Sequence, residues 1–147
     1  MADSRFPLQA VQDLARFREE EVGRMVALAA ARLAEGRQKA EVLRGYRADY
    51  ARQLIGDAGE GVEVGRMRDT LAFIARIDQA LEQQAIEVER LHAHWQAMVA
   101  EWGERTRELK TYEVLEQRHL DRLALRERRL EQRGTDDWAM RRRDADG

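Results

Sequence analysis

Apolar residues recur at alternating spacings of three and four along the first third of the chain, as in the core seam of a coiled coil. The seam positions are Leu8, Val11, Ala15, Arg18, Val22, Met25 and Ala29, followed by Leu33, Gly36, Ala40, Leu43, Arg47, Tyr50 and Leu54. The step from Ala29 to Leu33 breaks the alternation, which predicts a stutter that locally unwinds the supercoil. The pattern predicts a helix over about residues 8–55, with Pro7 in its first turn.

The same spacing returns in a second, longer stretch. Its seam positions are Met67, Leu71, Ile74, Asp78, Leu81, Ala85, Val88, His92, Trp95, Val99, Trp102, Thr106, Leu109, Glu113, Glu116, Leu120, Leu123, Glu127 and Leu130. Most of these positions are apolar, which predicts a helix over about residues 66–133. Gly134 is a natural helix stop, and the period is lost after it, so residues 134–147 are predicted to be a flexible tail.

Four glycines fall between the two periodic stretches, within residues 56–65. Glycine-dense segments favour turns, so this one is predicted to be a hairpin tip. The fold class is therefore all-α, with two long helices forming one antiparallel coiled-coil hairpin domain over residues 1–147. The second helix would exceed the first by about 30 Å at 1.5 Å per residue. Residues 114–133 are thus expected to lack an intramolecular partner, leaving Leu115, Leu120, Leu123, Leu125 and Leu130 available to another protein.

Composition agrees with a solvated helix pair. Charged residues make up 37% of the 147 residues, and the formal net charge is only −2. The absence of cysteine excludes a disulfide framework and cysteine-based metal sites or nucleophiles. The first residues have no apolar core of a signal peptide, and no apolar run is long enough to span a bilayer. A cytoplasmic protein is expected.

Residues that could support catalysis or metal binding are few. Ser4 is the only serine, and the glycine-rich segment has no lysine of a phosphate-binding loop. His92 and His94 do not have the i, i+4 spacing of a helical metal site. Asp78, Glu113 and Glu116 would need a water-excluding pocket for acid–base work, which a helix pair does not provide. No enzyme activity, metal or cofactor is expected.

Two features favour protein binding. Nine arginines lie between Arg118 and Arg143, but interleaved acidic residues favour a solvated face or a docking face over nucleic-acid binding. Tyr46 and Tyr50 lie one turn apart before the tip, and Phe73, Ile77 and Ala80 follow it at helical spacing. This set is either a broad seam or an exposed apolar stripe for a partner.

Several of these segments resemble the FliJ family, the small soluble component of the flagellar type III export apparatus. They are residues 43–50, the glycine-rich tip, residues 73–80, Trp102 and residues 109–118. The resemblance runs from Phe6 to about Arg142. It implies an antiparallel coiled coil similar to the γ stalk of rotary ATPases. It also implies a place in the centre of the export ATPase (FliI) ring, promotion of ring assembly, and contacts with the export gate protein FlhA and with export chaperones.

The resemblance further implies an export-gate surface at Leu43, Tyr46, Tyr50, Phe73, Ile77 and Ala80. Lys39 and Gln84 depart from the family pattern at its edges, where glutamine and histidine are expected. The ATPase contact would lie on the terminal parts of both helices, and Arg118, Arg122, Arg126 and Arg129 are the residues we assign to it. The protein would be peripheral to the cytoplasmic face of the inner membrane through protein contacts. The alternatives are the equivalent stalk of a virulence-type secretion system, a generic cytosolic coiled-coil scaffold, and an arginine-rich nucleic-acid binder.

Overall fold

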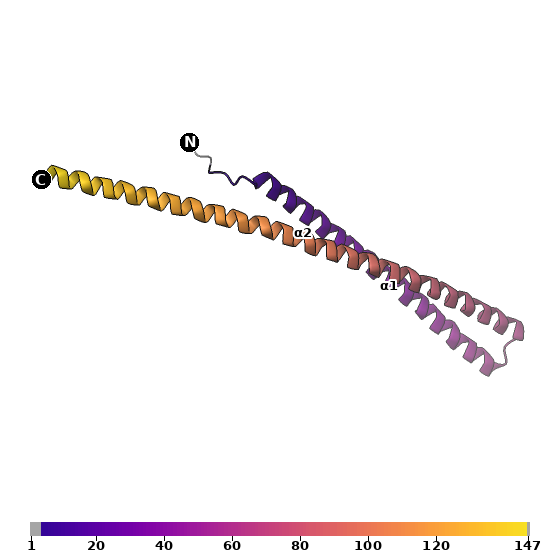
Figure 1. Ribbon diagram of the computed structural model, residues 1–147. Helices are drawn as coiled ribbons and strands as arrows, with labels where there is room; N and C mark the ends of the chain where they lie inside the picture. Colours follow the sequence, from indigo (N-terminus) through magenta and orange to yellow (C-terminus); the bar gives the residue numbers. More distant parts are fainter. Residues whose placement is uncertain (1–3, 147) are drawn as a thin grey trace. The chain divides into compact units, whose positions relative to one another are not determined.

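The computed structural model describes residues 4–146 and contains two long helices (Figure 1). Helix α1 runs over Gln9–Glu60 and helix α2 over Val64–Asp146, with 52 and 83 residues. Their sequences are rich in alanine, leucine, arginine and glutamate, all strong helix formers. The two helices pack against each other and residues 4–146 hold no strand, which confirms the all-α helical hairpin.

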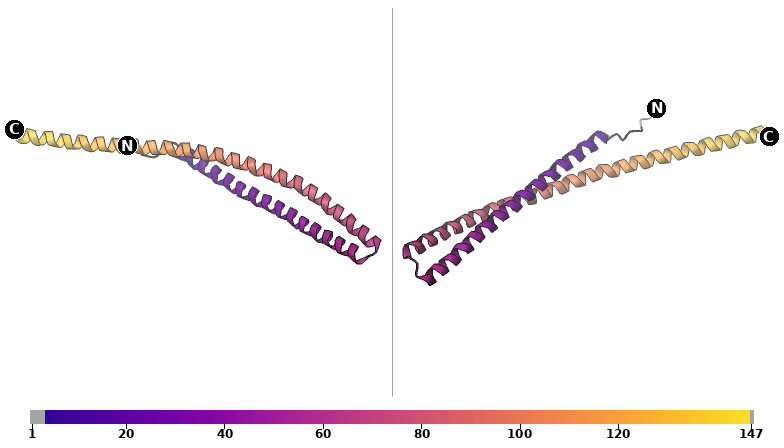
Figure 2. Two further views of the ribbon diagram at one scale, coloured as in Figure 1. Left: turned by 90° about the horizontal axis from the view of Figure 1, so that it is seen from below. Right: turned by 180° about the vertical axis from the view of Figure 1, so that it is seen from behind.

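The chain divides into two compact units. The hairpin unit comprises Glu21–Trp102, and the terminal unit comprises the segments before and after it. Within the hairpin unit, the C-terminal part of α1 and the N-terminal part of α2 lie side by side and antiparallel, joined by a short turn (Figures 1 and 2). The assignment of the whole chain to one domain stays a prediction.

The turn between the helices is much shorter than the ten-residue tip predicted from the glycines. Helix α1 continues through Gly56 and Gly59, and only Gly61 has a positive φ, of 69°. The Val62 amide donates to the Asp57 carbonyl oxygen at 3.1 Å, which is the 6→1 hydrogen bond of a Schellman C-cap. The predicted bounds of 55 and 66 were wrong because one left-handed glycine suffices to reverse the chain.

The core of the hairpin unit pairs small residues of α1 with large residues of α2. A Cβ added to Gly36 would lie 2.9 Å from Leu91 Cδ1, and one added to Gly23 would lie 3.3 Å from Trp102 Nε1. The buried apolar residues of this unit are Val22, Ala29, Leu33, Ala40, Ile74 and Ile77. Glycine and alanine on α1 therefore make room for leucine and tryptophan on α2, and the helices approach closely.

The stutter predicted in the first helix was wrong. The buried or partly buried positions of α1 recur without a break at 12, 15, 19, 22, 26, 29, 33, 36 and 40. The prediction placed Val11, Arg18 and Met25 in the seam, whereas Gln12, Glu19 and Val26 occupy it. Choosing apolar Val11 over its polar neighbour Gln12 moved the predicted register by one residue and created a false discontinuity.

In the terminal unit, contacts from the segment before α1 extend further along α2 than the predicted helix lengths indicated. The Phe6 and His119 rings lie 5.7 Å apart, and His119 Nε2 is 3.1 Å from the Ser4 carbonyl oxygen. Residues before α1 therefore cover part of the stretch expected to be unpartnered, and Leu115 and Leu123 are half-buried. All residues from 124 to 146 are exposed.

The predicted helix stop at Gly134 was also wrong. Helix α2 continues to Asp146, and a Cβ at Gly134 would meet nothing within 4 Å. A single glycine inside a helix costs only about 1 kcal/mol relative to alanine, which is too little by itself to end a helix.

Candidate binding surfaces

Three aromatic residues near the turn form a surface that joins the two helices. The rings of Tyr50 on α1 and Phe73 on α2 have centroids 4.7 Å apart and an interplanar angle of 58°. Phe73 is 42% exposed, and Tyr46, one turn before Tyr50, is 54% exposed. We call this set, with its half-buried neighbours Leu43 and Ala80, the aromatic surface.

Ile77 differs from the other predicted gate-binding residues because it is only 6% exposed. It belongs to the core beneath the aromatic surface and has little area to offer a partner. The broad seam and the exposed apolar stripe predicted from the sequence are thus both partly right, because Ile77 lies in the seam while Tyr46 and Phe73 face solvent. Ile77 supports the surface by fixing the part of α2 that carries Phe73.

An ion pair joins the two helices between residues that neighbour Tyr46 and Ile77 in the sequence. Arg47 Nε donates to Asp78, and its second nitrogen donates to the other carboxylate oxygen at 3.3 Å. The hydrogen bond from Arg47 to Asp78 raises the pKa of the Arg47 guanidinium. Both side chains are about half exposed, so the pair fixes the register of the helices more than it adds stability.

The two positions that depart from the FliJ pattern have structural partners. Gln84 Nε2 donates to the Gly36 carbonyl oxygen at 2.9 Å, a hydrogen bond between the helices. Lys39 lies 3.6 Å from Glu35 on its own helix. Gln84 therefore holds the edge of the aromatic surface in place, whereas Lys39 remains at the exposed rim.

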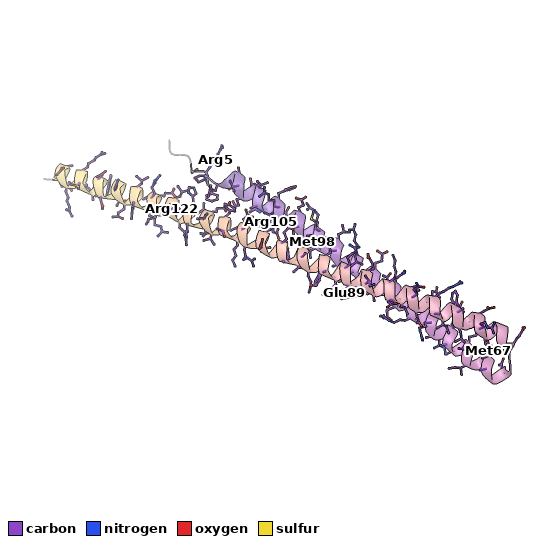
Figure 3. The ribbon with its side chains drawn as sticks, turned by 45° about the vertical axis from the view of Figure 1, so that its right-hand side comes forward. Arg5, Met67, Glu89, Met98, Arg105 and Arg122 are labelled. Atoms are coloured by element: carbon purple, nitrogen blue, oxygen red, sulfur yellow. The ribbon has the colours of Figure 1, made fainter. Side chains whose placement is uncertain are left out.

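The four arginines assigned to the ATPase contact lie on one face of α2. Arg118, Arg122, Arg126 and Arg129 follow at spacings of four, four and three, and Arg133 continues the row. We call these five residues the arginine face. Arg122, Arg126, Arg129 and Arg133 line a shallow hollow of about 480 Å³ with Leu125 and Leu130. Figure 3 shows Arg122 on this part of α2.

Among residues 4–146, acidic side chains neutralise little of the positive charge of the arginine face. Arg122 Nε donates to the Arg118 carbonyl oxygen at 3.4 Å, and within residues 4–146 no acidic side chain pairs with Arg126, Arg129 or Arg133. Like charges at i, i+4 destabilise an isolated helix by about 0.2–0.5 kcal/mol per pair. Arg133 was not among the residues assigned to the ATPase contact, although its i+4 spacing from Arg129 places it on the same face.

Two of the candidate catalytic and metal-binding residues, Asp78 and His92, have other partners. Asp78 is engaged by Arg47, and His92 lies against Trp95 with ring centroids 5.7 Å apart. Among the residues that the structure describes, no group of three or more histidines and carboxylates could hold a metal ion. Nor does any helix between residues 4 and 146 combine the length and apolar character that a membrane span requires.

Comparison with known proteins identifies the family. The profile described as "Flagellar FliJ protein" matches residues 4–144. The chain belongs to the FliJ family. Curated flagellar FliJ proteins of Salmonella typhi and Escherichia coli K12 are each 22% identical over 134 residues, covering 91% of this chain and 91% of theirs. No solved structure gives a significant match.

Membership of the FliJ family makes the chain a component of flagellar protein export. The FliJ match covers both units, because it begins before α1 and ends near the end of α2. The aromatic surface and the arginine face therefore both lie inside the matched region.

Proposed function

We propose that the protein acts in flagellar export by binding alone, as a stalk that joins the export ATPase to the export gate. The arginine face binds the ATPase ring (FliI) and promotes its assembly, and the aromatic surface binds the gate protein FlhA. Export chaperones are a third class of partner. The protein catalyses no reaction and is held at the cytoplasmic face of the inner membrane by its protein contacts.

One observation carries this proposal: the chain has two exposed surfaces of different chemistry in different units. The aromatic surface belongs to the hairpin unit and the arginine face to the terminal unit. Two surfaces with different chemistry suit two different partners, as a coupling protein requires. Membership of a family of flagellar export components supports the choice of these partners.

The aromatic surface has the composition of an interface centre. Tyrosine and phenylalanine supply large contact areas at low entropic cost, and aromatic residues dominate the binding energy of many interfaces. Tyr46 is more than half exposed and Phe73 nearly so, although both are large apolar side chains. Loss of either ring is expected to weaken gate binding far more than it weakens the fold.

The arginine face suits an acidic surface of the ATPase. Arginine makes bidentate hydrogen bonds with carboxylates, and the neighbouring Leu125 and Leu130 add apolar area in the same hollow. Acidic partner groups would relieve the repulsion within the row. Association through such a face is expected to weaken as salt rises.

The test measures binding to the purified export ATPase and to the cytoplasmic part of the gate protein. Replacing Arg122 and Arg126 by glutamate is expected to reduce ATPase binding at least about tenfold and to leave gate binding unchanged. Arg128→Glu is the matched control, because Arg128 lies in the same exposed segment but off the arginine face. Equal losses for the control and the double variant would contradict the assignment.

For the gate, Tyr46→Ala and Phe73→Ala are expected to weaken binding at least about tenfold while helicity stays nearly unchanged. Phe17→Ala is the control, since Phe17 is an exposed aromatic residue of the terminal unit. A collapse of the thermal melt by Tyr46→Ala would show that the aromatic surface is core rather than interface.

A further inference from the structure

A long groove runs along the hairpin unit on the flank away from the aromatic surface. One part of it, of about 590 Å³, lies between Ala34 and Ala40 of α1 and Leu81 and Ala85 of α2. A second part, of about 380 Å³, also includes Ala34 and reaches Trp95. Because Ala34 and Arg37 line both parts, they form one surface, which we call the alanine groove.

Helical position separates the alanine groove from the aromatic surface. Ala34, Arg37 and Arg44 each follow a seam position of α1 by one residue, and Ala85 does so on α2. Tyr46 and Phe73 instead precede a seam position by one residue. Residues on the two sides of a seam project to opposite flanks of a helix pair. A partner in the groove would thus leave the aromatic surface accessible.

The walls of the groove have the chemistry of a helix-docking site. Its floor is apolar, with Leu81, Val88 and Trp95 from α2. The α1 wall includes Ala30, Ala34 and Ala40 among longer polar side chains, and the small residues allow a third helix to approach closely. An extended peptide would fit poorly, because both walls are helices whose backbone groups are already paired.

Charge differs between the two rims. Arg37, Glu41 and Arg44 line the α1 side, and Glu41 is hydrogen-bonded to Arg44, which leaves Arg37 as the uncompensated charge there. Arg37 has no ion-pair partner among the residues that the structure describes. On α2, Glu82 and Glu89 are exposed and occupy the same flank as Ala85, at three and four residues from it (Glu89 is labelled in Figure 3).

We propose that the alanine groove binds one amphipathic α-helix of another protein. The helix presents an apolar stripe to Leu81, Val88 and Trp95. Acidic side chains along one edge of that stripe face Arg37, and basic side chains along the other edge face Glu82 and Glu89. The complex is a three-helix bundle whose third helix is supplied by the partner, and it is independent of the ATPase and gate contacts proposed above.

The probe is a fluorescent synthetic peptide of about 21 residues, which spans about 30 Å as a helix. It has leucine and alanine at heptad a and d positions, glutamate along one edge and lysine along the other. Its fluorescence anisotropy is titrated with the full chain. A peptide of the same composition with the apolar residues dispersed around the helix serves as the peptide control. Saturable binding of the amphipathic peptide alone is expected.

Variants locate the site. Ala34→Arg fills the groove and is expected to weaken peptide binding at least about tenfold. Ala31→Arg is its matched control, because Ala31 is an exposed alanine of the same helix that lines neither part of the groove. Arg37→Glu is expected to weaken binding about two- to fivefold, and Lys39→Glu on the other flank to leave it unchanged. Circular dichroism confirms that each variant is folded.

Three results would overturn the proposal. The first is equal binding of the two peptides, or none by the amphipathic one. The second is undiminished binding to the Ala34→Arg variant. The third is a dimer in sedimentation velocity that dissociates when Ala34→Arg is introduced, because the groove would then be occupied by a second copy of this chain.

Discussion

Among the described residues, the hairpin unit buries six apolar side chains and the terminal unit buries one. The hairpin unit buries mainly alanine, valine, leucine and isoleucine. In the terminal unit the buried residues are Gln12, at 1% exposure, and Ala15, at 3%; Gln12 Oε1 has no hydrogen-bond partner, and the same holds for Asp57 Oδ2 and His92 Nδ1 in the hairpin unit. Apolar burial stabilises by about 25 cal/mol per Å². We therefore expect the hairpin unit to hold most of the stability.

This difference suits the two roles proposed for the two surfaces. The hairpin unit is packed well enough to keep the aromatic surface in a fixed arrangement across two helices. The terminal unit includes residues 124–146, all exposed, and most of the arginine face lies there. A helix without an intramolecular partner keeps its whole surface available to another protein.

The largest expected effect is on the apolar core of the hairpin unit. Ile77→Ala should lower the free energy of unfolding by about 2–4 kcal/mol, because it leaves a cavity in the seam. Denaturant titration followed by circular dichroism measures the change. Leu71→Ala is the control, since Leu71 is 54% exposed, and its loss should be much smaller. Equal losses would mean that α2 packs in the other register.

The next effect concerns the turn. Gly61→Ala should lower the free energy of unfolding by about 1–2 kcal/mol, because Gly61 is the residue with positive φ. Gly59→Ala should be neutral or stabilising, since a Cβ there meets nothing within 4 Å. The difference between the two melting temperatures tests the Schellman cap, and destabilisation by Gly59→Ala would show that the turn is longer.

A third change would make the terminal unit more like the hairpin unit. Gln12→Leu should raise the free energy of unfolding by about 1 kcal/mol, because it replaces an unpaired buried amide by an apolar side chain. Gln9→Leu, at an exposed position of the same helix, should change it little. Destabilisation by Gln12→Leu would argue that the Gln12 amide is needed in the seam.

The smallest effect is expected at Gly134. Gly134→Ala should stabilise the surrounding part of α2 by about 1 kcal/mol through helix propensity, because nothing lies near the glycine. The measurement is hydrogen exchange of residues 124–146, which should slow while the denaturant midpoint stays the same. A shifted midpoint would mean that this segment takes part in the cooperative core.

The sequence predicted the helices and, from Met67 to Val88, every second seam position of α2. Met67, Ile74, Leu81 and Val88 were placed correctly, because the predicted and the observed registers of the seam share them. Between them the prediction chose Leu71 over Thr70 and Asp78 over Ile77, whereas Thr70 and Ile77 are buried. In a seven-residue repeat, the seam residue between two shared positions can lie either three or four residues after the first of them. The repeat alone does not decide between these two neighbouring positions. Contact between the helices decides it, so Ile77 could not be placed from the pattern alone.

The binding surfaces were predicted in part. The family resemblance and the helical spacing together predicted that Tyr46, Tyr50 and Phe73 lie close together. The ring contact between Tyr50 and Phe73 agrees with this prediction. The alanine groove was not predicted, because a seam pattern does not show on which flank of the seam the helices leave an open surface. It depends on the sizes of side chains on two helices, which only their packing reveals.

One measurement tests the central claim most directly, namely that the two surfaces serve different partners. Hydrogen exchange of the full chain is followed by mass spectrometry with and without the purified export ATPase. We predict fast exchange over residues 124–146 in the free protein, and protection of residues 118–133 but not of 43–50 or 73–80 in the complex. Protection confined to residues 43–80, with none on the arginine face, would contradict the account.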